Sequence, residues 1–292
     1  MKVKYSGGDK LFLIIDYILV TIVVIATLYP FLYVLSSSIS DPDLVMRGQI
    51  TLFPKGINFE AYKLVLKEKD IWVGYYNTLW YVFVGTSINI LMTTLAAYPL
   101  SRKKFAARNT VMMIMAFTMF FGGGMVPTYI LIKNVGIMNS RWAMVIPGAI
   151  STWNLIIMRT FFENIPESLH EAAFIDGAND LKILAKIILP LSKPVIAVMI
   201  LFYSVGHWNS FFNALLYLNT DKLYPLQMVL RKILIQYDVG DMMQGVKEDR
   251  GAMVGQSIRY ATIVISILPI ICIYPFMQKY FVQGVMIGAI KE

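Results

Sequence analysis

Residues 171–190 read EAAFIDGANDLKILAKIILP and place three acids and two lysines in a chain that is otherwise largely apolar. Of its 292 residues 57% are hydrophobic and only 15% are charged, and its mean hydropathy is +0.62. Soluble domains seldom reach such values, so the composition is typical of a membrane protein. Because ionisable side chains are costly inside a bilayer, we expect this charged segment to lie outside the hydrocarbon.

Six blocks of the sequence lack Asp, Glu, Lys and Arg and come close to the ~20 apolar residues that a helix needs to cross a bilayer. They are Tyr17 to Leu35, Ile71 to Leu100, Thr110 to Ile132, Trp142 to Met158, Pro194 to Thr220 and Tyr260 to Gln278. The first block is longer than a signal-peptide core and contains Tyr29-Pro30, which favours an uncleaved span. The sequence therefore predicts an all-α membrane protein with six transmembrane helices.

Short basic loops indicate the orientation of the spans, because Lys and Arg accumulate in cytoplasmic loops. The turn SRKKFAARN (101–109) carries four basic residues, whereas KNVGIMNSR (133–141) carries two. With the basic N-terminus, this predicts that both termini and residues 159–193 are cytoplasmic. Residues 40–70 and 221–259 then face outward, where their mixed charges and turn-forming residues favour small ordered caps.

Several function classes are disfavoured by what the sequence lacks. The net charge of +8 does not indicate nucleic-acid binding, because the basic residues are spread between apolar blocks. The single cysteine, Cys272, excludes an intrachain disulfide and a cysteine-cluster metal site. The six blocks contain none of the carboxylates that ion-coupled transport requires, Asp16 lying just outside the first, and no paired acids of an embedded enzyme appear.

The charged segment itself reads as two short helices joined by a turn. The first is expected from Pro166 to Asp176, since proline suits a first helical turn and Gly177 suits the left-handed residue that closes a helix. Asn179 is a good cap for a second helix, which begins with Asp180 and stops near Pro190.

The spacing of these residues resembles the EAA signature of the membrane subunits of bacterial ABC importers. Glu171-Ala172-Ala173 is followed after three residues by Gly177, and after nine more by Ile187, one residue, and Leu189-Pro190. The stretches NTLWYVF (77–83), PTYILIKNVGIMNSRWAMVIP (127–147) and ILFYSVGHWNSFFNALLYL (200–218) are similar to the carbohydrate-uptake, maltose-type branch. The segment from Asp249 to Phe281 resembles more narrowly the LplC and YtcP type of permease from Gram-positive bacteria.

The resemblance implies an ABC importer type I permease bundle in a bacterial cell membrane. Residues 1–70 would hold the first helix and an outer segment, residues 71–282 the core permease domain with the EAA loop at 163–193, and residues 283–292 a cytoplasmic tail. The implied partners are a second homologous permease, two ATPase subunits, an extracellular solute-binding protein and membrane lipid. ATP and Mg would be bound by the ATPase, because this chain has no G-x-x-x-x-G-K-[ST] phosphate loop and no cofactor of its own is expected.

In that family the EAA loop forms a coupling helix that docks in a groove of the ATPase, which implies that the chain is a transport subunit and not an enzyme. We expect Glu171 to make polar contact with the groove, and Ala172 and Ala173 to allow close approach. Gly177 would form the turn. The signature residues expected to couple to the ATPase are Glu171, Ala172, Ala173, Asp176, Gly177, Leu189 and Pro190.

Polar and aromatic residues at membrane depth are the candidates for the substrate path. Trp208, Asn209 and Asn213 come from GHWNSFFN in the fifth span, with His207 beside them, and Trp153 and Asn154 come from the fourth. An amide beside an aromatic ring suits a sugar, which presents hydroxyl edges and C–H faces. The same residues also fit hydrogen bonds between helices and an interfacial aromatic belt, so both interpretations stay open.

Two further questions stay open at this stage. GGGMVP (122–127) fits a broken third span that exposes its backbone, and it fits close packing of helices, the reading we favour. The substrate is expected to be a sugar or oligosaccharide on resemblance, with a non-sugar solute as the alternative.

Overall fold

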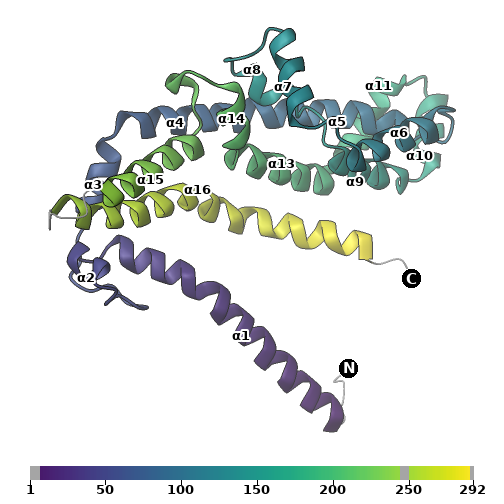
Figure 1. Cartoon of the computed structure of the whole chain (residues 1–292). Helices are drawn as coiled ribbons and strands as arrows, with labels where there is room; N and C mark the ends of the chain where they lie inside the picture. Colours follow the sequence, from purple (N-terminus) through teal and green to yellow (C-terminus); the bar gives the residue numbers. More distant parts are fainter. Residues whose placement is uncertain (1–6, 244–249, 290–292) are drawn as a thin grey trace. The chain divides into compact units, whose positions relative to one another are not determined.

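The structure is a computed structural model that describes residues 7–243 and 250–289, and within these ranges the chain is helical and contains no strand (Figure 1). The helices are α1 (Gly7–Ser38), α2 (Pro42–Met46), α3 (Glu60–Lys67), α4 (Lys69–Trp80), the π-helix η1 (Tyr81–Gly85), α5 (Thr86–Ser101), α6 (Arg108–Phe120), α7 (Met125–Asn134), α8 (Trp142–Val145), α9 (Thr152–Glu163), α10 (Glu167–Ile175), α11 (Asp180–Ile183), the π-helix η2 (Leu184–Ile188), α12 (Leu189–Leu191), α13 (Lys193–Trp208), α14 (Phe212–Tyr217), the 3-10 helix η3 (Asp221–Leu223), α15 (Leu226–Met243) and α16 (Arg250–Ala289).

The chain forms two compact units. The first comprises the chain up to Lys69 together with Leu230–Leu268, and the second comprises Asp70–Val229 together with the chain from Pro269 onward. All of the predicted coupling and path residues belong to the second unit.

In the first unit, the end of α1 is tied to the segment that follows it. Ser36 Oγ donates to the carbonyl of Leu52 at 2.6 Å, and the hydroxyls of Ser38 and Tyr62 lie 2.8 Å apart. These serines are buried, whereas the apolar side chains along the rest of α1 are largely exposed. The exposed apolar surface is what a helix facing lipid or another membrane chain requires.

The second unit is built on one long helix, formed by α4, η1 and α5 in unbroken succession (Figure 1). From residue 77 to residue 97 every fourth residue is buried: Asn77, Tyr81, Asn89, Thr93 and Ala97, with Gly85 in the same series. A four-residue repeat drifts by about 40° per step around a helix with 3.6 residues per turn. The wider π-helical turn of η1 takes up part of that drift, so the buried stripe keeps facing α9 and α13.

The N-terminal half of this helix holds the segment that precedes α15. Asn77 Nδ2 donates to the carbonyls of Lys222 and Tyr224, and Tyr81 donates to that of Leu223. The Arg141 guanidinium donates to Asn77 Oδ1 at 2.9 Å. The start of the predicted outer segment 221–259 is therefore ordered against the spans by hydrogen bonds.

Three of the predicted spans are not straight helices. The third bends by 114° between α6 and α7, the fourth is interrupted between α8 and α9, and the fifth ends at Trp208 before the short α14. A Cβ added at Gly122 or Gly123 would meet nothing within 4 Å. Our favoured interpretation of these glycines as a site of close helix packing is therefore wrong within the second unit, and they break the span instead.

By length and composition, three helices of the described residues could cross a membrane, and the number reaches five if each bent pair forms one span. They are Gly7–Ser38, Lys69–Ser101 and Gly255–Pro275, and the bent pairs are α6 with α7 and the Asp180–Leu191 segment with α13. The predicted first and second spans lie within such helices. The count of six and the orientation of the termini stay predictions.

Candidate functional site

The segment 167–191 folds as the two helices that the sequence predicts. Pro166 precedes α10, and Gly177 adopts the left-handed conformation with φ of 76° just after it. The side chain of Asn179 accepts a hydrogen bond from the Lys182 amide at 2.9 Å and caps α11. The chain then continues through η2 and ends this helical stretch at Leu191, one residue past Pro190.

This segment has an exposed face and a buried face. Glu171, Ala172 and Asp176 are exposed, together with the apolar side chains of Phe174 and Leu181. Ile175 is 84% exposed, so α10 ends in an apolar surface that no part of its unit covers. An exposed apolar patch of this kind is typical of an interaction surface.

The buried face packs against the spans of the same unit. Ala173 is only 7% exposed and lies in one apolar cluster with Tyr98, Met158 and Ile183. The small side chain at Ala173 therefore lets α10 approach its own chain closely. Of the remaining signature residues, Leu189 is half-buried and Pro190 is exposed.

Polar contacts join the same segment to the C-terminal end of α5, a feature that the sequence did not reveal. Arg102 Nη2 lies 2.7 Å from Glu167 Oε1, and Tyr98 donates to Asp180 Oδ1 at 3.2 Å. The rings of Tyr98 and His170 are stacked with centroids 6.0 Å apart. His170 is 4% exposed, and its Nδ1 atom has no hydrogen-bond partner among the described residues.

The environment of His170 favours its neutral form. Burial lowers the pKa of the imidazole, and the Arg102 guanidinium lowers that pKa further, against the opposite effect of Glu167 and Asp180. The ring is therefore uncharged at neutral pH and acts in packing.

The six candidate path residues do not converge on one surface. Trp208 is 6% exposed and lies edge-on to Tyr75 with centroids 6.2 Å apart, and Asn154 is also buried. Trp153 is 60% exposed, and Asn209 and Asn213 are exposed. Within this unit, Trp153, Asn209 and Asn213 are the ones that remain accessible to a solute.

His207 is placed in a buried hydrogen-bonded group instead. Its Nε2 atom lies 2.7 Å from Asn89 Oδ1, while Asn89 Nδ2 donates to the carbonyls of Gly148 and Ala149 at 2.7 and 3.0 Å. Because the amide hydrogens of Asn89 are used on carbonyls, Oδ1 is the acceptor and His207 Nε2 must donate. This arrangement fixes the tautomer of the histidine.

The bond between His207 and Asn89 belongs to a set of contacts that joins α5, α13 and the break before α9. The Tyr203 hydroxyl lies 2.7 Å from Thr93 Oγ1 and accepts from the Ser151 amide at 3.1 Å. Asn89 donates to the carbonyls of Gly148 and Ala149 on the other side of that break. Irregular backbone at membrane depth is tolerated only when protein groups satisfy it, and these side chains do so.

The described residues contain no cluster of three His, Cys, Asp or Glu side chains that could hold a metal ion. What the sequence reasoning missed was the series Asn77, Asn89 and Thr93 in the second span. The spacing of these residues in multiples of four is visible in the sequence and was the signal that could have identified the buried polar face.

Comparison with known proteins gives consistent matches over nearly the whole chain. The family model of the binding-protein-dependent transport system inner membrane component matches residues 71–287. Protein LplC of Bacillus subtilis (strain 168) is 40% identical over 269 residues, covering 91% of this chain and 90% of that protein. The polygalacturonan/rhamnogalacturonan transport system permease protein YtcP of the same organism is 37% identical and covers 97% and 99%.

A solved structure matches the fold as well. One chain of the crystal structure of a bacterial ABC transporter involved in the import of the acidic polysaccharide alginate superposes with a TM-score of 0.85 and 35% sequence identity. The match covers 96% of this chain and all of that chain. The helical arrangement is therefore the fold of an ABC transporter permease.

Gly85→Ala is expected to destabilise the protein by about 1–3 kcal/mol, because a new Cβ would lie 2.5 Å from His207 Nε2 and force the ring away from Asn89. Thermal unfolding of the purified protein in detergent measures the effect. Gly206→Ala is the matched control, since nothing lies within 4 Å of its added Cβ. Equal melting temperatures for the two variants would contradict the close approach.

Acidification is expected to destabilise the protein through His170. The imidazole has a lowered pKa when folded and one of about 6.5 when unfolded, so the unfolded chain binds the proton more readily as the pH falls below that value. The contribution of neutral His170 to the free energy of unfolding is thus complete above about pH 6.5 and is lost as the pH falls through the lowered pKa of the folded protein. Melting temperatures at pH 7.5 and 5.5 should differ less for His170→Gln than for the wild type. An identical pH dependence in both proteins would argue against a buried neutral histidine.

Proposed function

The chain belongs to the family of binding-protein-dependent transport system inner membrane components, and from that membership we propose that this permease imports an oligosaccharide. It is a membrane transport subunit and not an enzyme, and proteins of this family work with a second permease, an ATPase and a solute-binding protein. The energy for transport comes from the ATPase.

Support for a sugar substrate comes from the relatives. YtcP is named for polygalacturonan and rhamnogalacturonan, and the similar solved structure serves import of alginate. AraQ of Halalkalibacterium halodurans, 25% identical, is named for arabinooligosaccharides. Trp153, Asn209 and Asn213 are exposed in the second unit and have the ring faces and amides that bind C–H faces and hydroxyls of a sugar.

The observation that carries the coupling role is the exposed apolar end of α10. Phe174, Ile175 and Leu181 are exposed in a segment that also contains exposed Glu171 and Ala172. A surface of this kind needs a partner, and the family has an ATPase to supply one. We assign Glu171, Ala172 and Asp176 to contact with the ATPase and Gly177 to the turn that shapes the surface.

The finer organisation of the transporter follows the sequence predictions. Six spans with both termini in the cytoplasm would put α10 and the basic turn 101–109 on the ATPase side. A heterodimer with a second permease and two ATPase subunits would complete the importer. Ala173 and Leu189 would then hold α10 and α12 on the spans rather than contact the ATPase, whereas the exposed Pro190 stays a candidate for that contact.

Reconstitution tests the proposed substrate class. The permease pair, ATPase and solute-binding protein encoded together would be placed in proteoliposomes with labelled galacturonan, alginate and arabinan oligosaccharides outside. We expect ATP-dependent uptake of at least one of them and none by the permease alone. Uptake limited to peptides or polyamines would contradict a sugar substrate, and flux through the permease alone would contradict the ATP-driven mechanism.

Gly177→Leu is expected to lower transport by about tenfold while ATP hydrolysis stays within about twofold, because a side chain is strained at a φ of 76° and will distort the surface offered to the ATPase. Gly177→Asn is the matched control, since asparagine tolerates the left-handed conformation. Membrane insertion of each variant is checked by its amount in the membrane fraction. Unchanged transport in the leucine variant would count against this role of the turn.

A further inference from the structure

The last turn of α5 and Arg102, the residue that follows it, hold both short helices of the coupling segment at the same end of α5. Arg102 pairs with Glu167, the first residue of α10, and Tyr98 donates to Asp180, the first residue of α11. Tyr98 and Arg102 are one helical turn apart. Two helices that are joined only by the Gly177 turn are thus attached at two points to a single element.

Two points of attachment define an orientation where one point would not. A single contact lets a helix swing about it, whereas contacts at the starts of both α10 and α11 set the angle of the pair. The stacking of His170 on the Tyr98 ring adds a third contact in the middle of α10. The resulting group, Tyr98, Arg102, Glu167, His170 and Asp180, is called the α5 clamp below.

Packing around the clamp leaves room for the helices to turn. A cavity of about 820 Å³ lies among α5, α10 and α11, with Leu95, Tyr98, Arg102, His170, Asp180 and Leu184 in its wall. Closely packed interiors resist displacement, and the space leaves this side of the two short helices without close packing. Apolar contacts at Ala173 and Ile183 hold the segment to the spans, and the polar contacts are left to set its angle.

The weakness of the ion pair between Arg102 and Glu167 fits a role in setting the angle of the segment rather than in holding it to the spans. The Arg102 and Glu167 side chains are 17% and 37% exposed, and ion pairs with that much solvent add little to stability. Loss of the pair should therefore leave the protein folded. The Arg102 guanidinium is planar and its hydrogen-bond donors have fixed directions, so the pair can orient α10 although it adds little to the stability of the fold.

We propose that Tyr98 and Arg102 are positioning residues for energy coupling, which fix α10 and α11 on the end of α5 so that movement of the ATPase is transmitted to the long α4–α5 helix. This inference rests on the proposed function, in which α10 docks on an ATPase. It adds two residues outside the EAA signature. It also identifies the long α4–α5 helix as the membrane element to which movement of the ATPase is transmitted. Without the clamp, the ATPase would turn the segment in place, and α5 would follow it less.

The test uses the complete importer in proteoliposomes and measures substrate transported per ATP hydrolysed. Arg102→Glu and Glu167→Arg each place like charges against each other where the native atoms are 2.7 Å apart. We expect each single variant to lower the ratio by about tenfold, which is within the range for residues that carry coupling between sites. ATP hydrolysis should stay within about twofold of the wild type in both.

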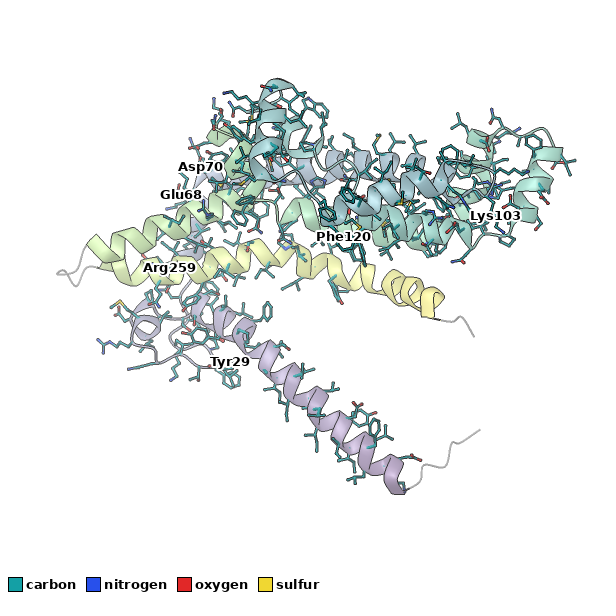
Figure 2. The ribbon with its side chains drawn as sticks, turned by 45° about the vertical axis from the view of Figure 1, so that its right-hand side comes forward. Tyr29, Glu68, Asp70, Lys103, Phe120 and Arg259 are labelled. Carbon is teal, nitrogen blue, oxygen red and sulfur yellow. The ribbon has the colours of Figure 1, made fainter. Side chains whose placement is uncertain are left out.

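The double variant Arg102→Glu with Glu167→Arg separates positioning from simple damage. It restores an ion pair, so the ratio should recover to within about threefold of the wild type, the remainder reflecting an arginine at the unfavourable end of the α10 dipole. A double variant no better than the worse single variant would overturn the proposal. Lys103→Glu is the matched control. Lys103, labelled in Figure 2, follows Arg102 in the turn 101–109 and is exposed, so this variant should leave the ratio unchanged. A loss in Lys103→Glu equal to that in Arg102→Glu would also overturn the proposal.

Tyr98→Phe keeps the ring against His170 and removes only the hydroxyl that reaches Asp180, so it tests the second attachment without a change of charge. It should lower the ratio and leave co-purification of the ATPase intact, whereas an unchanged ratio would remove Tyr98 from the proposal. The wild-type complex decides the wider question. If the wild-type complex shows no ATP-dependent uptake, both the proposed function and the positioning role of the α5 clamp are wrong. If it transports but the double variant does not recover the ratio, only the positioning role is wrong.

Discussion

The second unit depends on one constraint: inside a bilayer, every backbone and side-chain polar group must find its partner within the protein. The long α4–α5 helix satisfies its own backbone, and its buried stripe also satisfies neighbours that are not helical. Asn77 holds the carbonyls before α15, and Asn89 holds those of the break before α9. Broken spans are stable here because an unbroken one supplies their hydrogen bonds.

The same helix connects the two ends of the unit. At its N-terminal end it orders the segment 222–226, and at its C-terminal end it contacts the first residues of α10 and α11. A rigid element that contacts both regions is the kind of connection through which two sites in a membrane protein influence each other. Transport driven by an ATPase requires such a connection, because the chain that uses ATP is separate from the chain that forms the path.

Sequence reasoning was reliable where the signal is local. Capping by Asn179, the left-handed Gly177 and the helix that starts after Pro166 are consequences of neighbouring residues, and the structure has all three. It was less reliable where the outcome depends on distant residues. Gly122 and Gly123 could break a helix or pack against one, and nothing within their own segment decides between these. The environments of Trp208 and His207 depend on distant residues for the same reason: the ring of Tyr75 packs against the tryptophan and Asn89 binds the histidine.

The amino-acid sequence by itself determined the class of protein, the membrane environment, the family and the local shape of the EAA segment, because hydropathy, turn chemistry and motif spacing are properties of contiguous residues. Only the tertiary structure decided that Ala173 faces its own chain while Glu171 and Ala172 face outward. It also decided that Tyr98 and Arg102 meet Asp180 and Glu167 across more than sixty residues of sequence. Such pairings arise when helices pack against each other, and the residue spacing within one helix does not predict them.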